Sequence, residues 1–408
     1  MRRAAWVLLL TFPAIVQGCG RSDTLSPCNI ATKACQEDVF YSDLRLRGAA
    51  FDPFGGVPPI TTVTLAEFRQ QLLDAQKSAS ASTPKDSGKP KIDPWDVAFG
   101  LLGLIKPSTS TAAAAVQDQV SNVAAFYSST TRSVTVIDRG GDRNDYGDTK
   151  LLSHELVHAF QDQDNEFEGF GNNRTTDSGF AARALTEGEA TLYEQLAGAE
   201  MDEIEPKTLD WDGYYGGWVK SLRNRLPQQE STYYAVNWFV YPLGAGMLTR
   251  AWLDGGPAGV RHVIAAFPNR TLDFLASRDG FTASARIELQ CSVKPLGKGF
   301  KRVGLDRFGA LQFYAFLVAA GVSEQDAWSY AEDWRDDSLW LYFDEARADV
   351  VVYWRHRLGS SAAAEAVVDA IPPSTARALD AIDRDVLIRA SNVPSLVADG
   401  QGAVDCEP

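Results

Sequence analysis

The segment TKLLSHELVHAFQDQ, residues 149–163, contains His154, Glu155 and His158 in the spacing His-Glu-x-x-His. Apolar residues recur through it at helical intervals, which predicts one helix with Asp148 as its N-cap. Residues four apart lie one above the other on a helix, about 6 Å apart along its axis. Both imidazoles therefore point to one side, where they can hold a single metal ion. The buried side of this helix is expected to consist of Leu151, Leu152, Leu156 and Phe160.

Two imidazoles beside a carboxylate suit zinc chemistry. Catalytic Zn²⁺ binds neutral imidazole nitrogen and carboxylate oxygen, usually through three protein ligands, and keeps one position open for water. Zinc lowers the pKa of that water to about 7, and a carboxylate such as Glu155 can take its proton during attack on a carbonyl. The motif therefore predicts Zn²⁺ as the cofactor, His154 and His158 as ligands, and Glu155 as the catalytic base.

A second helix, beginning near Asp177 or Ser178 and running to about residue 200, is the best source of the third ligand. Its segment ALTEGEATL, residues 184–192, contains Glu187, which we choose as the ligand over Glu189 and Glu194. Glu189 is instead expected to be a solvated surface charge. Gly188 lacks a side chain, so it is expected to let this helix approach the first one closely.

The spacing of HELVHAFQDQ (154–163) and Glu187 resembles the gluzincin class of zinc metallopeptidases, whose third ligand is a glutamate on the next helix. These segments, with YPLGAGM (241–247) and AWSYAEDWRDDSLWLY (327–342), also resemble a group of bacterial secreted or lipid-anchored proteins with a peptidase-like domain. The resemblance extends from about residue 126 to 371. It implies metal ligands at His154, His158 and Glu187, a base at Glu155, and a donor to the substrate oxyanion at Tyr241.

Several positions leave alternatives open. Tyr233 and Tyr234 rival Tyr241 on sequence alone, and each of the three could instead be a buried structural tyrosine. Thermolysin-like members of the class carry an aspartate four residues after the ligand glutamate, where this chain has Thr191, so we expect Asp162 to support a histidine instead. Residues 333–337 replace the usual glycine-rich segment of the group. The other two histidines, His262 and His356, are expected to be surface or structural residues, and the aromatic stretch 210–218 a loop.

The N-terminus resembles a bacterial export signal. Two arginines precede an apolar stretch that is too short to span a bilayer, and Val16-Gln17-Gly18-Cys19 resembles a lipobox. We therefore expect residues 1–18 to be removed and Cys19 to carry a lipid that anchors the exported protein to the membrane of the cell envelope. An ordinary signal peptide is the alternative. Removal of the two arginines changes the formal charge from -14 to -16.

Charge and cysteine content limit the remaining possibilities. With 39 Lys and Arg against 53 Asp and Glu and no basic run, binding to nucleic acid is not expected. An exported chain keeps its disulfides. Once Cys19 carries lipid, four cysteines remain, and because short loops close at the lowest entropic cost we predict Cys28–Cys35 and Cys291–Cys406 among three possible pairings.

The whole chain is predicted to be a mainly helical α+β protein with a zincin-like metallopeptidase core and a small β-sheet. Its expected parts are the signal peptide (1–18), a tether (19–60), a helical segment with a flexible loop at 77–91 (61–110), the catalytic core (111–230), and a mainly helical α+β region (231–408). Elements expected outside the two site helices include a hairpin at 126–137, strands at 339–343 and 349–354, and a capped helix at 323–334. The predicted activity is zinc-dependent hydrolysis of a peptide or protein. A non-catalytic zinc-binding envelope lipoprotein and a hydrolase of other amides are the alternatives.

Overall fold

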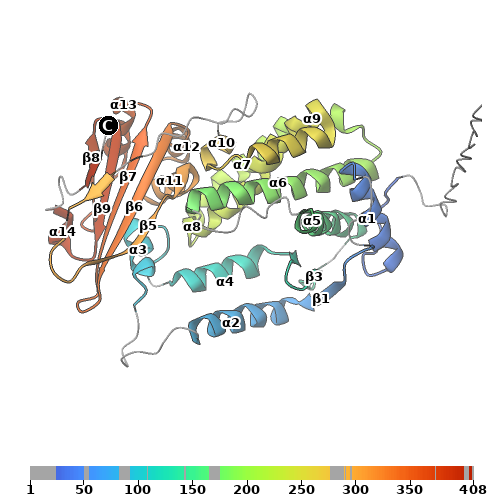
Figure 1. Cartoon of the computed structure of the whole chain (residues 1–408), viewed down its shortest axis with the longest axis horizontal. Coiled ribbons are helices and arrows are strands. Elements are labelled where there is room, and N and C mark those ends of the chain that lie inside the picture. The colour runs from blue at the N-terminus through green and yellow to red at the C-terminus, as the bar shows by residue number, and fades with distance from the viewer. Residues whose placement is uncertain are drawn as a thin grey trace, which may run out of the picture.

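The computed structural model shows a mainly helical α+β protein (Figure 1). It describes residues 24–49, 55–81, 92–107, 109–141, 144–164, 175–275, 289, 291–294, 296–372, 374–398 and 404–406. The signal peptide, the lipobox and most of the loop expected at 77–91 lie outside these residues. Within the described part of the chain, no helix combines the length and apolar character needed to cross a membrane.

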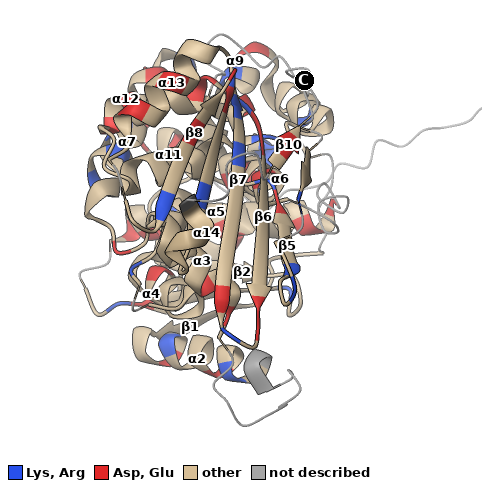
Figure 2. Ribbon diagram, turned by 90° about the vertical axis from the view of Figure 1, so that its left-hand side faces the viewer, with Lys and Arg blue, Asp and Glu red and all other residues tan. Residues whose placement is uncertain are grey.

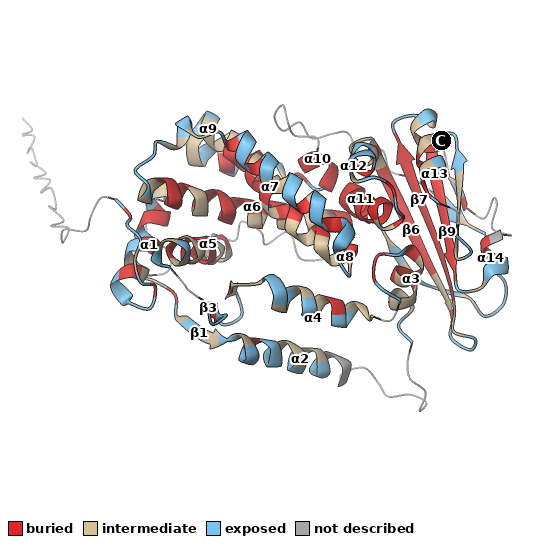
Figure 3. Ribbon diagram, turned by 180° about the vertical axis from the view of Figure 1, so that it is seen from behind, coloured by how far each residue is buried: buried red, intermediate tan, exposed pale blue. Residues whose placement is uncertain are grey.

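Three long helices form the centre of the molecule: α5 (Asp145–Gln163), α6 (Thr176–Met201) and α9 (Val240–Ala266). The side chain of Asn144, rather than Asp148, caps α5 by accepting a hydrogen bond from the Gly147 amide, and Thr175 caps α6. Helix α6 packs between α5 and α9 and is buried along much of its length (Figure 3). Since α9 belongs to the predicted C-terminal region, one core joins that region to the predicted catalytic core.

Glycines allow the close crossing of α6 and α9. A Cβ atom built on Gly188 would lie within 3 Å of Gly244 backbone atoms and 2.7 Å from the Ala245 nitrogen. A Cβ on Gly244 would in turn collide with the carbonyl of Ala184. Gly188 therefore admits α9, and the expectation that it serves the approach of α5 is wrong.

The segment 24–49 is folded, which corrects the tether predicted at 19–60. Helix α1 (Lys33–Leu46) packs against α5 and α6 and buries Val39, Phe40 and Leu44. Cys28 and Cys35 form the predicted disulfide just before and within this helix. Because α1 packs against α5 and α6, Arg47, which directly follows α1, lies buried beside these two helices.

A three-stranded sheet lies beside α5. The predicted hairpin is confirmed as β2 (Ala125–Ser128) and β3 (Ser133–Asp138), and β1 (Ile60–Thr64) pairs with β3 in parallel. The strand order is β1-β3-β2, so β2 is an edge strand of this sheet. Helix α2 (Leu65–Ala81) contacts this sheet and is largely exposed, and α4 (Thr111–Asn122), which packs against α2, is partly exposed (Figure 3).

A five-stranded antiparallel sheet forms the other end of the molecule, in the order β5-β6-β7-β9-β8. The two predicted strands are confirmed as β6 and β7 and are longer than expected. Helices α3, α11 and α13 pack against this sheet. Ser323 caps α12 as predicted. The bounds are β5 (Lys301–Asp306), β6 (Trp334–Asp344), β7 (Asp349–Leu358), β8 (Arg377–Ile382), β9 (Asp385–Ser391), α3 (Pro94–Leu102), α11 (Gly309–Ala319), α12 (Glu324–Glu332) and α13 (Ser361–Ala370).

Shorter elements connect these parts. Residues 211–225 form α7 (Trp211–Arg225), so the aromatic stretch expected as a loop is helical and buries Trp211 and Tyr215. Strands β4 (Cys291–Val293) and β10 (Val404–Cys406) pair next to the second predicted disulfide, Cys291–Cys406, which is confirmed. The other short elements are α8 (Thr232–Ala235), α10 (Thr271–Leu275) and α14 (Pro394–Ala398).

A buried carboxylate ties α6 to α10. Asp177 Oδ1 accepts hydrogen bonds from the backbone nitrogen of Thr271 at 2.8 Å and from its hydroxyl at 2.6 Å. Burial raises the pKa of Asp177 to about 6, although the Thr271 hydrogen bonds oppose the shift.

Acidic and basic residues are intermixed along the ribbon (Figure 2).

Candidate metal centre

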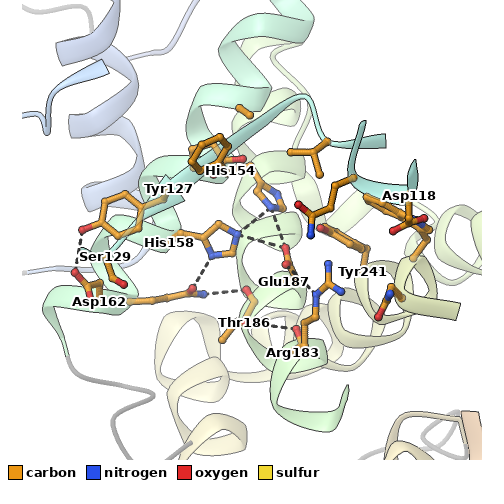
Figure 4. Close-up of a pocket in the computed structure, with 18 of the residues that line it drawn as sticks. Asp118, Tyr127, Ser129, His154, His158, Asp162, Arg183, Thr186, Glu187 and Tyr241 are labelled. Atoms are coloured by element: carbon orange, nitrogen blue, oxygen red, sulfur yellow. Dashed lines mark hydrogen bonds and ion pairs between the residues drawn. The ribbon is translucent and has the colours of Figure 1, made fainter. Parts of the chain in front are cut away.

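The motif histidines and Glu187 meet between α5 and α6 (Figure 4). His154 Nε2 lies 3.2 Å from His158 Nε2 and 3.3 Å from Glu187 Oε2. His158 Nε2 lies 3.3 Å from the same Glu187 oxygen. Three potential ligand atoms from two helices therefore form a nearly equilateral triangle.

The partners of the other imidazole nitrogens fix the tautomer of both rings. His154 Nδ1 lies 3.2 Å from Glu194 Oε2, and a carboxylate can only accept a hydrogen bond. His158 Nδ1 lies 2.8 Å from Gln161 Oε1, an amide oxygen that also only accepts. Both Nδ1 atoms must then carry the proton, which leaves a lone pair on each Nε2. Two such lone pairs and a carboxylate oxygen repel one another at these distances unless a cation or protons lie among them.

The triangle fits a zinc ion. Tetrahedral Zn²⁺ with bonds of about 2.0–2.1 Å to nitrogen and oxygen places its ligand atoms about 3.3 Å apart. The three measured separations, 3.2 to 3.3 Å, match that edge. The donor set also suits zinc, since all three atoms are neutral imidazole nitrogen or carboxylate oxygen. Among the described residues, this is the group of histidines and carboxylates whose geometry can hold a metal.

The electrostatics of the triangle favour positive charge. Burial alone would lower the pKa of His154, but Glu187 and Glu194 outweigh it and raise that pKa to about 10. The pKa of His158 is raised in the same way by Glu187. Burial would raise the pKa of Glu187, and the two histidines instead hold it well below its usual range. A bound metal would displace these protons and supply the positive charge itself.

Glu155 lies in the same pocket and is only 5% exposed. Its Oε2 atom has no hydrogen-bond partner among the residues that the structure describes, whereas the carboxylate accepts a hydrogen bond from the Tyr127 backbone. Burial raises the pKa of Glu155, with His154 and His158 opposing the shift. A buried carboxylate oxygen without a partner, on a residue that lines the pocket next to the triangle, is available to accept a proton.

The pocket has a volume of about 750 Å³, and its lining comes from α4, β2, α5, α6, α8 and α9 and from the short 3₁₀ helix Val236–Phe239. Strand β2 contributes one wall, and α4 with Tyr234, Trp238 and Tyr241 contributes the opposite one, where Trp238 donates a hydrogen bond to Asp118 at 3.0 Å. The ring of Tyr241 stacks on His154 with 6.0 Å between centroids, so its position is compatible with the oxyanion role. Tyr233 does not line the pocket, because its ring packs 4.4 Å from Phe99 in the core.

Arg183, which the sequence did not single out, completes the pocket. Its Nε atom lies 3.4 Å from Glu187 Oε1, one turn along α6, and its guanidinium lies 5.9 Å from the centre of the Tyr241 ring. The position could have been found as the residue four before Glu187, on the same face of the helix. Arg183 adds a cationic donor beside the open side of the triangle.

Supporting contacts differ from those predicted. Asp162 does not contact a motif histidine; its Oδ2 accepts a hydrogen bond from the Tyr127 hydroxyl at 2.9 Å. Gln161 supports His158 instead. It lies three residues after His158, and this position of α5 faces α6, whereas the position of Asp162, four residues after His158, does not. Glu194 is not one of the three triangle residues, but its carboxylate accepts a hydrogen bond from His154 and so supports that histidine. Glu189 is not a surface charge, since its side chain is 2% exposed and pairs with Arg47.

The remaining histidines lie away from the site. His262 is exposed on α9, and His356 is fully buried between the rings of Phe313 and Trp354. These positions confirm one surface and one structural histidine.

Comparisons of the chain with protein-family models, curated proteins and solved structures gave no match. The functional reading therefore depends on the site itself.

Proposed function

We propose that this protein is a zinc-dependent hydrolase of peptide bonds with a zincin-type helix pair similar to that of the gluzincins. The observation that carries the proposal is the triangle of His154 Nε2, His158 Nε2 and Glu187 Oε2, whose sides match tetrahedral zinc. The buried, unpartnered Oε2 of Glu155 favours an enzyme over a purely structural zinc site, which needs no base.

Zinc held by the three ligands would supply a Lewis acid and lower the pKa of water at its open position to about 7. Glu155 accepts a proton from the attacking water and passes it to the nitrogen of the leaving amine. The carbonyl oxygen gains negative charge in this step. Tyr241, whose ring stacks on His154, and Arg183, which pairs with Glu187, are the donors to which we assign its stabilisation.

The pocket wall supports an extended peptide as substrate. Ala125, Phe126 and Tyr127 of edge strand β2 line the pocket, so backbone groups of that strand lie beside the reacting position. An extended peptide can pair with a strand edge as an added strand, with alternate side chains entering pockets on either side. Trp238 and Tyr234 provide aromatic surface on the opposite wall.

Metal analysis and a peptide-cleavage screen on the same preparations test this proposal. The parent should hold one equivalent of zinc after dialysis and cleave members of a peptide library. Glu155→Gln should keep zinc and lose turnover by about 10²–10⁴-fold, because the base is not a ligand. Glu187→Ala should lose both.

Two outcomes would overturn the proposal. Undiminished cleavage by Glu155→Gln would remove the base from the mechanism. Zinc in the parent without cleavage of any peptide would instead support the non-catalytic envelope lipoprotein.

A further inference from the structure

The N-terminal segment reaches the back of the metal centre through a continuous set of buried polar contacts. Arg47, directly after α1, donates to Glu189 Oε1 from Nε at 3.2 Å and from Nη2 at 2.9 Å. Glu189 Oε2 accepts a hydrogen bond from the amide nitrogen of Gln161 at 2.9 Å. Gln161 Oε1 then accepts from His158 Nδ1 at 2.8 Å. Arg47, Glu189 and Gln161 thus connect α1 to the proposed ligand His158; we call these three residues the positioning chain.

The orientation of the Gln161 amide is fixed by its surroundings. Its nitrogen faces two acceptors, Glu189 Oε2 at 2.9 Å and the backbone oxygen of Thr186 at 3.0 Å. The reverse orientation would put the amide oxygen against two oxygen acceptors, which repel it, and would lose both hydrogen bonds of the amide nitrogen. The amide oxygen must therefore face His158, and a proton must occupy His158 Nδ1. That proton leaves the Nε2 lone pair free for a metal.

Arg47 fixes the position of the buried Glu189 carboxylate. The side chains of Arg47 and Glu189 are 7% and 2% exposed, and the two hydrogen bonds from the guanidinium to Oε1 leave Oε2 directed at Gln161. Arg47 is itself held by Asp164 at 3.1 Å and by the rings of Phe160 and Tyr193. Without Arg47 the Glu189 carboxylate would lose two hydrogen bonds and its fixed orientation toward Gln161.

We propose that Arg47, Glu189 and Gln161 are positioning residues that hold His158 in the tautomer that metal binding requires. The N-terminal segment is thereby part of the metal centre. This inference rests on the proposed metal site, but it does not depend on peptide hydrolysis. Outer partners of histidine ligands commonly change metal affinity 10- to 100-fold.

Zinc affinity, measured by competition with a chromophoric chelator, is the first test. Gln161→Met keeps the size of the side chain and removes both ends of the amide, so it should weaken zinc binding 10- to 100-fold. Arg47→Met should weaken it about tenfold. Arg45→Met is the matched control, because Arg45 also links α1 to α6, through Glu200 at the surface, without touching the positioning chain. It should leave zinc affinity unchanged.

A second variant keeps the test valid if Arg47→Met fails to fold. Replacing both members of a buried ion pair by apolar residues is often neutral for stability. The combination of Arg47→Met with Glu189→Leu should therefore fold and still bind zinc at least tenfold more weakly than the parent. Parent-like affinity in that folded double variant, or in Gln161→Met, would overturn the proposal.

The His158 Nδ1 proton provides a readout that a general loss of stability would not move. The chain has only four histidines, so their ¹⁵N-labelled imidazoles can be assigned by single substitution. In the metal-free parent the Nδ1 proton should exchange slowly with water, and in Gln161→Met and the double variant it should exchange rapidly. Equal exchange in all variants would refute the positioning chain. A parent that binds no zinc would refute the proposed function, while this exchange measurement would still decide the positioning role.

Discussion

Replacement of Gly188 by alanine should disturb the metal centre without touching any ligand. The added methyl group points at the backbone of α9, 2.7 Å from the Ala245 nitrogen. The Gly244 carbonyl carbon is closer still, and ordinary contact begins at about 3.4 Å, so the two helices must separate by about 1 Å. Glu187 is the neighbouring residue on α6 and moves with the helix, whereas the histidines remain on α5.

Two opposing contributions determine the expected change in the free energy of unfolding of Gly188→Ala. Overpacking against backbone, which cannot rotate away, should cost about 3 kcal/mol, the upper end of the usual range. Alanine stabilises a helix by up to about 1 kcal/mol relative to glycine. The net loss in the free energy of unfolding should be about 2 kcal/mol. A displacement near 1 Å at a catalytic site can reduce turnover about 100-fold, so zinc affinity and turnover should both fall.

Urea unfolding, chelator competition and turnover on one preparation measure these quantities. Gly217→Ala on α7 is the control, because a methyl group there meets no atom within 4 Å. It should gain about 0.5–1 kcal/mol in stability and keep parent activity. A Gly188→Ala variant as stable as Gly217→Ala, with parent zinc affinity, would refute the reasoning about the helix crossing.

Three further predictions concern separate parts of the chain. Tyr241→Phe should lower kcat about 10²–10³-fold with little change in KM or zinc content, and an unchanged kcat would exclude a contact with the reacting carbonyl. Asp177 has its pKa raised to about 6 in the folded state, so the folded protein binds the proton more tightly and its contribution to stability falls as pH rises from about 4 to 6. In Asp177→Asn, Oδ1 can still accept both Thr271 hydrogen bonds. Between pH 4 and pH 7 the free energy of unfolding of this variant, measured with urea, should therefore rise by up to about 3 kcal/mol relative to that of the parent. Parallel pH profiles for the two proteins would contradict this. We propose that Cys19 carries a lipid, so Cys19→Ala should leave the membrane fraction or retain its signal peptide, and a variant that fractionates and migrates like the parent would count against the lipobox.

The parts of the site that were predictable from sequence depend on helix geometry alone. The spacing of His154 and His158 places both rings on one face of α5, and the structure brings Glu187 to them as chosen. Both disulfides were also predictable. Cys28 and Cys35 close the shortest loop, and Cys291 and Cys406 are then left to pair with each other. That these residues bind zinc remains a proposal.

The missed features depend on tertiary contacts that no local pattern encodes. Helix α1 was not predicted because Ser42 and Asp43 interrupt its apolar side. Both residues are nevertheless buried: Ser42 is hydrogen-bonded to Glu200, and Asp43 to Ser153. Glycines in the stretch 210–218 suggested a loop, although Trp211 and Tyr215 are spaced for one buried helix face.

The choice between Asp162 and Gln161 depended on the face of α5 that meets α6. Only the packed structure shows that this face carries Gln161. Glu189 was misjudged because its cation, Arg47, lies 142 positions away.

The packing of the N-terminal segment also limits how far the body of the protein could lie from a membrane. Leu25 is buried, and its amide donates to Glu200 at 2.7 Å, so the chain is held to the body of the protein at this residue. Five residues separate it from Cys19, and the six Cα–Cα steps between the two can span at most about 20 Å. A tether extending to residue 60 would instead have allowed a reach of about 140 Å. With a lipid on Cys19, as we propose, Leu25 would lie within about 20 Å of the lipid-bearing residue.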